Sequence, residues 1–267
     1  MELSKQFLSF TNEKTRTDWL FGQTDPGAIR EFNEDSLLFM ATKKLFIVAD
    51  GMGGHNAGEV ASQKAVETVN ACLTVEILKQ AEGDKDKTRE ALTNSIKDAH
   101  KEISQMADDN HELYGMGCTL IAGLVNGDLL HLGHVGDSRA YLVDETEIKL
   151  LTIDHSYVME LVQAGEMTMA ESRRSALKNE LSQAIGASDT VVPDYNCHSL
   201  KPGDKVLLCS DGLWDMLEDS AIFEIVKLKQ PIEEICKILI DSANIAGGKD
   251  NISVVIYHHI ENEKNQK

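Results

Sequence analysis

The chain has 267 residues, 42% of them hydrophobic and 26% charged, which is the composition of an ordinary globular protein. Its formal net charge of −18 argues against nucleic acid and membrane as partners, because both favour lysine and arginine. No stretch resembles a signal peptide, and none approaches the roughly 18 apolar residues of a membrane span. The five cysteines include no Cys-x-x-Cys pair and lie mostly in apolar runs, as in a reducing compartment. We therefore expect a cytoplasmic protein.

Apolar periodicity divides the chain into helices and short strands. Strands at 37–40 and 45–49 lead into a helix over about 56–73, and a second amphipathic helix follows over about 92–106. Further strands are expected at 118–125, 128–135, 139–143, 205–210 and 252–259, and further helices at 156–165, 219–229 and 232–246.

Consecutive strands joined by tight turns, such as the Asn126-Gly127 turn, predict antiparallel sheets covered by paired helices. Residues 166–187 are polar and poorly periodic, and we expect them to run over the surface. This pattern predicts one α+β domain over residues 1–260, followed by a frayed tail at 261–267. No exposed apolar helix face suggests an obligate dimer, so a monomer is expected.

The segment "LFIVADGMGGHNAGEV" (residues 45–60) delivers Asp50 from an apolar strand into a glycine-rich loop. A nucleotide P-loop is excluded, because Glu59 and Val60 follow Gly58 where Lys and Ser or Thr are required. The dinucleotide pattern fails as well, since its third glycine would fall on Asn56. This loop is therefore not built to hold phosphate by itself.

Aspartates recur at the ends of predicted strands. They are Asp35, Asp50, Asp137, Asp211 and Asp250, and no lysine or arginine close in sequence pairs with most of them. If these carboxylates cluster, they repel one another unless cations neutralise them. All-oxygen ligand sets suit Mg²⁺ or Mn²⁺, and a glycine such as Gly51 lets a backbone carbonyl approach the metal closely. The pattern predicts a divalent-metal centre that in turn holds phosphate.

An ordered set of motifs carries a resemblance to a known family. The motifs are "GAIREFNEDS", "VADGMGGHNAGEVAS", "GHVGDSRAY", "LTIDHS", "CSDGLWD" and "GGKDNISVV". They resemble, in order and over about residues 22–257, the metal-dependent serine/threonine protein phosphatases of type 2C in their bacterial form. The family's fold is a four-layer α-β-β-α sandwich, in which helices pack outside two antiparallel sheets. This agrees with the strands and helices expected above.

The resemblance implies a role for each matching residue. Asp50 would bridge two Mn²⁺ or Mg²⁺ ions, with the Gly51 carbonyl on one of them and Asp211 and Asp250 on the other. Asp35 would act through water held by the metal, and Asp137 would bind a third, weaker ion that it shares with Asp211.

The substrate side follows in the same way. Arg30 matches the residue that clamps the substrate phosphate, and its forked guanidinium suits a phosphoryl group. Water activated between the two ions would hydrolyse the phosphomonoester directly, without a protein nucleophile. Phosphorylated proteins, as targets of a serine/threonine kinase, would be the substrates.

The sequence departs from the family pattern at two points. Eukaryotic members carry a histidine directly after the first Asp-Gly, where this chain has Met52. His55, three residues further on, is a candidate to protonate the leaving alkoxide. Residues 166–187 correspond to the family's flap, where bacterial members often show His-Pro and this chain has Ser175-Ala176. The second departure concerns substrate preference and leaves the metal centre intact.

Two alternatives remain open beside the protein phosphatase. One is a non-catalytic scaffold with the same fold, although such relatives typically lose a metal aspartate and here all of them are present. The other is a metal phosphoesterase acting on a small molecule, because function depends on the site and its rim. An aspartyl-phosphate hydrolase is not among them, because "DKDKT" at 84–88 matches its motif by letter only and we expect these residues to be a solvated loop.

Overall fold

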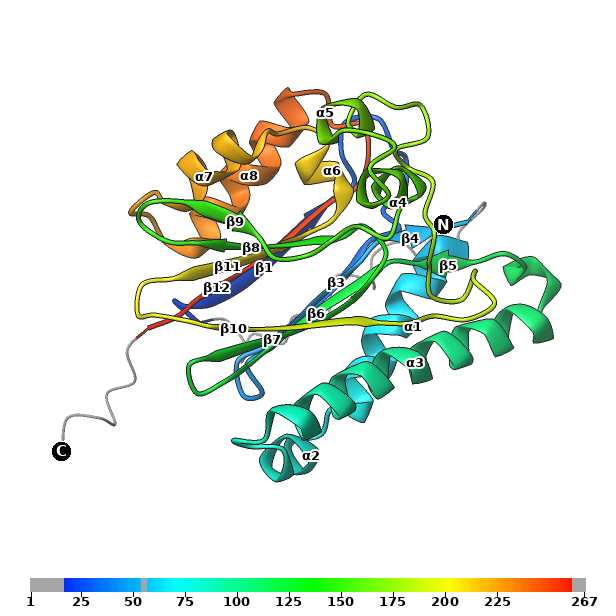
Figure 1. Cartoon of the computed structure of the whole chain (residues 1–267), viewed down its shortest axis with the longest axis horizontal. Coiled ribbons are helices and arrows are strands. Elements are labelled where there is room, and N and C mark those ends of the chain that lie inside the picture. The colour runs from blue at the N-terminus through cyan, green and yellow to red at the C-terminus, as the bar shows by residue number, and fades with distance from the viewer. Residues whose placement is uncertain (1–16, 54–56, 261–267) are drawn as a thin grey trace, which may run out of the picture.

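A computed structural model describes residues 17–53 and 57–260 of the chain. Within these residues, two five-stranded antiparallel sheets pack face to face, and helices cover the outer face of each (Figure 1). The predicted α+β, four-layer α-β-β-α architecture is confirmed.

The first sheet has the strand order β1-β12-β11-β8-β9. Its strands are β1 (Leu20–Asp25), β12 (Ile252–His258), β11 (Lys205–Cys209), β8 (Arg139–Val143) and β9 (Ile148–Leu150). The second sheet has the order β10-β7-β6-β3-β2. Its strands are β10 (Asp194–Ser199), β7 (Leu129–Val135), β6 (Leu120–Asn126), β3 (Leu45–Ala49) and β2 (Ser36–Met40). A short antiparallel pair is formed by β4 (Gly51–Met52), which follows β3 in the chain, and β5 (Gly117–Cys118), which precedes β6.

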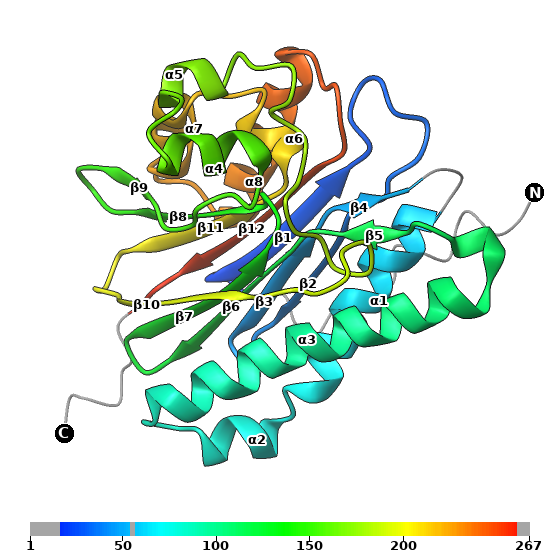
Figure 2. The same cartoon turned by 45° about the vertical axis from the view of Figure 1, so that its right-hand side comes forward.

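The helices form the two outer layers. The second sheet is covered by α1 (Ala57–Cys72) and α3 (Lys85–Asp109), with α2 (Val75–Gln80) and the 3₁₀ turn η2 (His111–Leu113) at the two ends of α3. The first sheet is covered by α6 (Asp211–Trp214), α7 (Asp219–Val226) and α8 (Ile232–Ile245). Figure 2 shows α1 and α3 on one side of the sandwich, α7 and α8 on the other, and α4 (Tyr157–Gln163) and α5 (Met169–Ser172) near α6.

Apolar side chains fill the three spaces between these layers. The helix stripe expected from Ala61, Ala65 and Val69 packs on the second sheet. Between the sheets, the stacked rings of Phe46 and Tyr257 lie 5.5 Å apart, centroid to centroid. Because both sheets are buried on both faces, their central strands are apolar almost throughout rather than alternating.

Some elements differ from the sequence-based prediction. Strands β1, β9 and β10 and helix α2 were not expected. Residues 84–88 are not a solvated loop but begin α3, because Asp84 caps the helix by accepting hydrogen bonds from the backbone N–H groups of Asp86 and Lys87. The β6–β7 turn consists of Gly127-Asp128, one residue later than predicted, since Asn126 still pairs with Leu129.

The flap residues 166–187 contain only the short helix α5 and lie against the segment that follows α6. Arg173 Nη1 is 2.5 Å from Glu218 Oε2, and Lys178 forms an ion pair with Asp215. Ion pairs therefore connect this polar surface segment to the first-sheet side of the molecule.

The cysteines in the described residues form no disulfide. Cys118, Cys209 and Cys236 are buried, and burial raises the pKa of each thiol. In residues 17–53 and 57–260, no helix is both long and apolar enough to cross a membrane.

Candidate metal and phosphate site

The aspartates singled out in the sequence come together at one end of the sandwich. Strands β3, β7 and β11 run toward this end, and β2, β8 and β12 start from it, as antiparallel neighbours must (Figure 2). The aspartates are Asp35 before β2, Asp50 after β3, Asp137 between β7 and β8, Asp211 at the start of α6 and Asp250 before β12.

The backbone of Asp50 is fixed from the neighbouring strand. Its N–H donates to Thr119 Oγ1 at 3.2 Å, and its carbonyl accepts from the Thr119 N–H at 2.8 Å. The same Thr119 hydroxyl lies 2.7 Å from Ser138 Oγ, next to Asp137. Two of the aspartate-bearing loops are thus joined through one buried threonine.

Glycine at position 51 is required by close backbone contacts. A Cβ there would lie 2.3 Å from the Gly58 carbonyl oxygen and 2.4 Å from the Glu34 carbonyl oxygen. No other residue fits without moving the start of α1 or the loop before β2. Gly51, at the start of β4 directly after Asp50, is therefore tightly packed between these two segments.

Asp35 and Asp211 carry carboxylate oxygens that lack protein partners. Asp35 is 7% exposed, and its Oδ2 accepts a hydrogen bond from Ser210 Oγ at 2.8 Å. Its Oδ1 and the Oδ1 of Asp211 are both buried and have no hydrogen-bond partner in the part of the chain that the structure describes. An unpaired buried carboxylate oxygen is costly in the absence of a cation or water.

Burial and mutual repulsion act in the same direction on these carboxyls. Burial raises the pKa of Asp35 to about 6 and that of Asp137 to about 7. Burial, followed by repulsion from neighbouring aspartates, raises the pKa of Asp50 and of Asp211 well above the ordinary value. Full ionisation of these aspartates is therefore unfavourable. A divalent cation would offset both the burial of their charges and the repulsion between them.

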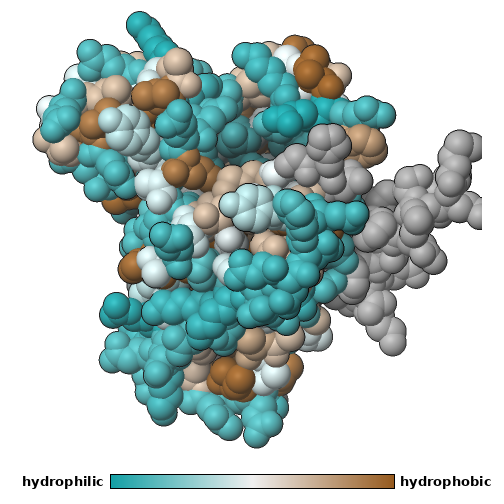
Figure 3. Space-filling model, turned by 90° about the vertical axis from the view of Figure 1, so that its right-hand side faces the viewer, coloured by the Kyte–Doolittle hydropathy of each residue, from teal (hydrophilic) through white to brown (hydrophobic). Residues whose placement is uncertain are grey.

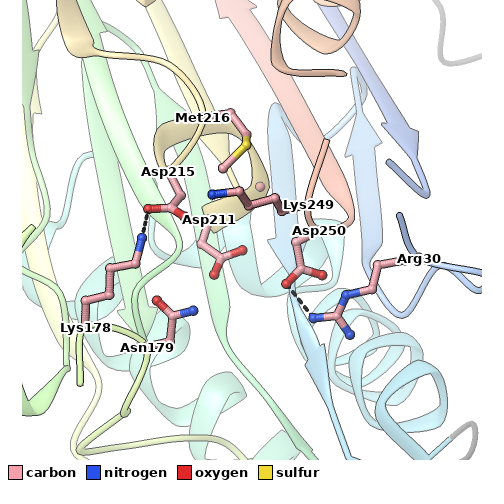
Figure 4. A pocket seen from close by; sticks show the side chains of 9 residues that line it. Arg30, Lys178, Asn179, Asp211, Asp215, Met216, Lys249 and Asp250 are labelled. Carbon is pink, nitrogen blue, oxygen red and sulfur yellow. Dashed lines mark hydrogen bonds and ion pairs between the residues drawn. The ribbon is translucent and has the colours of Figure 1, made fainter. Parts of the chain in front are cut away.

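The oxygen donors fit Mn²⁺ or Mg²⁺ in kind, but their side chains are spread apart. Among the described residues, the aspartate oxygens do not form a group of three within 4.8 Å of one another. One reason is that Asp250 turns toward Arg30, with 2.7 Å between Oδ2 and Nη2 (Figure 4). The predicted phosphate clamp and one predicted metal ligand are thus brought together as an ion pair.

Asn251 holds the loop that carries Arg30. Its Nδ2 donates to the carbonyls of Pro26 and Phe32, at 3.0 and 2.9 Å, and its Oδ1 accepts the Glu34 N–H at 2.8 Å. Three hydrogen bonds from one side chain therefore define the β1–β2 loop. Asn251 lies in the quoted "GGKDNISVV" motif, but no local pattern points to its partners.

A buried ion pair supports the Asp137 loop from below. Arg139 and Asp154 are about 5% exposed, and Arg139 donates to both carboxylate oxygens, with the shortest contact at 2.7 Å. The guanidinium lies 3.7 Å from the ring centroid of Trp214, whose Nε1–H donates to the Asp137 carbonyl at 3.1 Å. No role was expected for Arg139 or Asp154, although they lie in the quoted motifs "GHVGDSRAY" and "LTIDHS".

A second group of potential metal ligands lies beside this loop. Ring nitrogens of His134 and His155 and an oxygen of Asp194 fall within 4.8 Å of one another. The His134 Nε2 lies 2.9 Å from the Ile153 carbonyl, whereas the Gly136 N–H donates to His155 Nδ1 at 3.3 Å. In the neutral ring the proton of His155 is therefore on Nε2, the nitrogen that faces Asp194 at 3.5 Å. We interpret this group as a hydrogen-bonded support and not as a metal site.

The predicted site residues thus lie at one end of the molecule, with one exception. Arg30, Asp35, Asp50, Gly51, Asp137, Asp211 and Asp250 all belong to the strand-end loops described above. His55 falls outside the described residues, and its role stays a prediction.

Comparison with known proteins agrees with this geometry. The sequence profile described as Protein phosphatase 2C matches residues 29–246. The serine/threonine phosphatase stp of Listeria monocytogenes is 37% identical over 255 residues, which are 92% of this chain and 96% of that protein.

Solved structures agree as well. The serine/threonine phosphatase PstP/Ppp of Mycobacterium tuberculosis has a TM-score of 0.82 and 33% identity, covering 91% of this chain and 98% of that one. A PstP catalytic domain in complex with two manganese ions has a TM-score of 0.78 and 34% identity, with coverages of 91% and 98%. With the profile spanning most of its length, the chain belongs to the protein phosphatase 2C family.

Proposed function

We propose that this protein is a metal-dependent phosphoserine/phosphothreonine protein phosphatase that hydrolyses the phosphomonoester directly. The observation that carries the proposal is the set of buried and partly buried aspartates at one end of the sandwich, two of which bear unpaired carboxylate oxygens, beside an arginine on the rim. Family membership and the serine/threonine phosphatases among the relatives support it.

Two Mn²⁺ or Mg²⁺ ions would be held by Asp50, the Gly51 carbonyl, Asp211 and Asp250, with Asp35 acting through water. A third, weaker ion would take Asp137 together with Asp211. When bound, such ions lower the pKa of a water molecule and neutralise charge on the phosphoryl oxygens. The manganese complex of PstP and the donor chemistry of these residues support this assignment.

The chain's own groups bind and orient the substrate. Arg30, with its side chain 52% exposed, exchanges Asp250 for the substrate phosphate and holds two phosphoryl oxygens with its fork. Asp35, held by the hydrogen bond from Ser210, orients the attacking water by accepting a hydrogen bond from its O–H. His55 is proposed to protonate the leaving alkoxide.

The proposal extends to the domain organisation and the cellular setting. We infer one phosphatase domain over residues 1–260 with its flap at 166–187, a cytoplasmic location, and substrates phosphorylated by a serine/threonine kinase. We also infer a monomer. On the face shown in Figure 3, the coloured atoms are mainly hydrophilic and apolar residues occur in small separate groups.

The test is phosphate release from a phosphothreonine peptide by purified protein with Mn²⁺, with EDTA, and with Asp211→Asn in parallel. We expect Mn²⁺-dependent release that EDTA abolishes and that Asp211→Asn lowers by roughly 100-fold or more. Equal release by Asp211→Asn would overturn the metal assignment. No release from several phosphopeptides while Mn²⁺ still binds would favour a scaffold, and release only from small phosphate esters would favour a small-molecule phosphoesterase.

A further inference from the structure

A pocket of about 280 Å³ opens beside Asp211 and Asp250. Lys178 and Asn179 of the flap close one wall, and Met216 and Lys249 form the other (Figure 4). The pocket therefore adjoins the proposed phosphate position and is lined by the flap.

The charges around this pocket are unequal in their pairing. Arg30 is paired with Asp250, and Lys178 with Asp215. Lys249 lies within 4.0 Å of no carboxylate oxygen in the described part of the chain, and its side chain is exposed. One lining cation is thus left available, on a protein whose formal net charge of −18 otherwise repels acidic ligands.

The position of Lys249 is fixed by its backbone. Gly248 adopts a φ of 50°, and its carbonyl accepts hydrogen bonds from the N–H groups of Ala28 and Ile29, at 2.8 and 3.1 Å. A Cβ on Gly248 would lie 2.6 Å from the Ala28 nitrogen, so the two loops meet closely. Arg30 and Lys249 therefore lie on the rim next to the contact between these two loops.

We propose that this pocket is the subsite for an acidic residue adjacent to the phosphorylated residue of a protein substrate, with Lys249 as its cation. The inference rests on the proposed function. Arg30 takes the phosphate, and the carboxylate of a neighbouring Glu or Asp enters between Lys249 and the flap. Lys178 contributes by neutralising Asp215, which would otherwise repel that carboxylate.

The test uses phosphothreonine peptides that differ only by Glu, Ala or Lys at one flanking position, scanned from two residues before the phosphothreonine to two after it. Wild type, Lys249→Ala and Lys249→Glu are compared at saturating Mn²⁺, with Lys237→Ala on the exposed face of α8 as the matched control. At one position at least, wild type should prefer Glu over Ala by about twofold to fivefold in kcat/KM, as an exposed ion pair allows.

Lys249→Ala should remove this preference, Lys249→Glu should reverse it in favour of the Lys peptide, and Lys237→Ala should keep it. The preference should also shrink in about 0.5 M NaCl, because salt screens an exposed pair. Comparing ratios between peptides within each variant cancels any change in overall rate that a substitution at Lys249 causes through the neighbouring Asp250.

Each outcome decides between the two claims. Equal rates on Glu, Ala and Lys peptides at every position, with Mn²⁺-dependent release intact, would overturn the subsite and leave the proposed function standing. A Glu preference that survives in Lys249→Glu would overturn the role of Lys249. No release from any peptide, with p-nitrophenyl phosphate still hydrolysed, would overturn the protein-phosphatase assignment and the subsite with it.

Discussion

Arg30 and Asp250 neutralise each other across the mouth of the site, with 2.7 Å between Nη2 and Oδ2. A divalent ion and a substrate phosphate would each compete for one member of this pair. Arg30→Ala is therefore expected to lower kcat/KM for a phosphopeptide by roughly 100-fold. Mn²⁺ should bind the variant at least as tightly as wild type, because no cation competes for Asp250.

Isothermal titration with Mn²⁺ and peptide kinetics check the two halves of this prediction separately. Arg30→Lys is the matched variant, which keeps the charge and loses the forked guanidinium. Its activity should therefore fall between those of wild type and Arg30→Ala. Weaker Mn²⁺ binding by Arg30→Ala would show that Arg30 supports the metal ligands instead of competing with the ion.

Asn251→Ala tests the support of the β1–β2 loop. The substitution removes the hydrogen bonds to Pro26, Phe32 and Glu34 and leaves every proposed metal ligand in place. We expect KM for the phosphopeptide to rise more than kcat falls, because the loop carries the phosphate clamp. Steady-state kinetics at saturating Mn²⁺ measure this split, and an unchanged KM would contradict it.

Removing one partner of the buried pair of Arg139 and Asp154 should lower the stability strongly, because the other charge stays buried. Asp154→Ala leaves the buried guanidinium without its carboxylate, so the free energy of unfolding should fall by about 3–5 kcal/mol. Lys101→Ala breaks the exposed pair with Asp98 and should cost less than about 1 kcal/mol. Urea denaturation of both variants in EDTA gives the comparison, and similar costs would contradict it.

The pH dependence of the metal-free protein follows from the raised aspartate pKa values. Folding raises the pKa of Asp35 to about 6 and that of Asp137 to about 7, so the folded state binds protons that the unfolded state has released. Their contribution to stability is complete below the unfolded pKa near 3.8 and is lost as the pH rises through 6 and 7.

In EDTA, the free energy of unfolding should therefore fall from about pH 5 to about pH 8. The slope should be about 1.4 kcal/mol per pH unit for each proton involved. Asp137→Asn should flatten the upper part of the curve, and saturating Mn²⁺ should flatten all of it. Urea titrations at several pH values measure the slope, and a free energy that rises over this range would refute the assignment.

The metal-ligand candidates could be predicted because each one lies in a local pattern, an aspartate at the end of an apolar run. Antiparallel pairing then brings the end of one strand beside the start of the next, as seen for Asp211 after β11 and Asp250 before β12. Asp50 follows β3 in the other sheet, which packs face to face with this one. The partners of Asn251 and Arg139 could not be predicted in this way. Asn251 binds residues 217 to 225 positions away, and no local pattern encodes such contacts.

The missed elements have equally physical reasons. Strand β1 reads "LFGQTD", in which a glycine and polar residues hide the strand pattern, and it forms through pairing with β12. Residues 84–88 looked like a loop because they are charged. The Asp84 cap and the exposed position of the first turn let those charges begin a helix.

The three fully buried cysteines have a consequence for how the protein would respond to oxidants. Peroxide and alkylating reagents react with thiolates at accessible positions. Cys118, Cys209 and Cys236 meet neither requirement, because they are buried and burial raises the pKa of each thiol. A phosphatase that works through carboxylates and a divalent ion also needs no cysteine in its reaction. Dephosphorylation by this protein should therefore continue through an oxidative burst that silences enzymes with a catalytic thiolate.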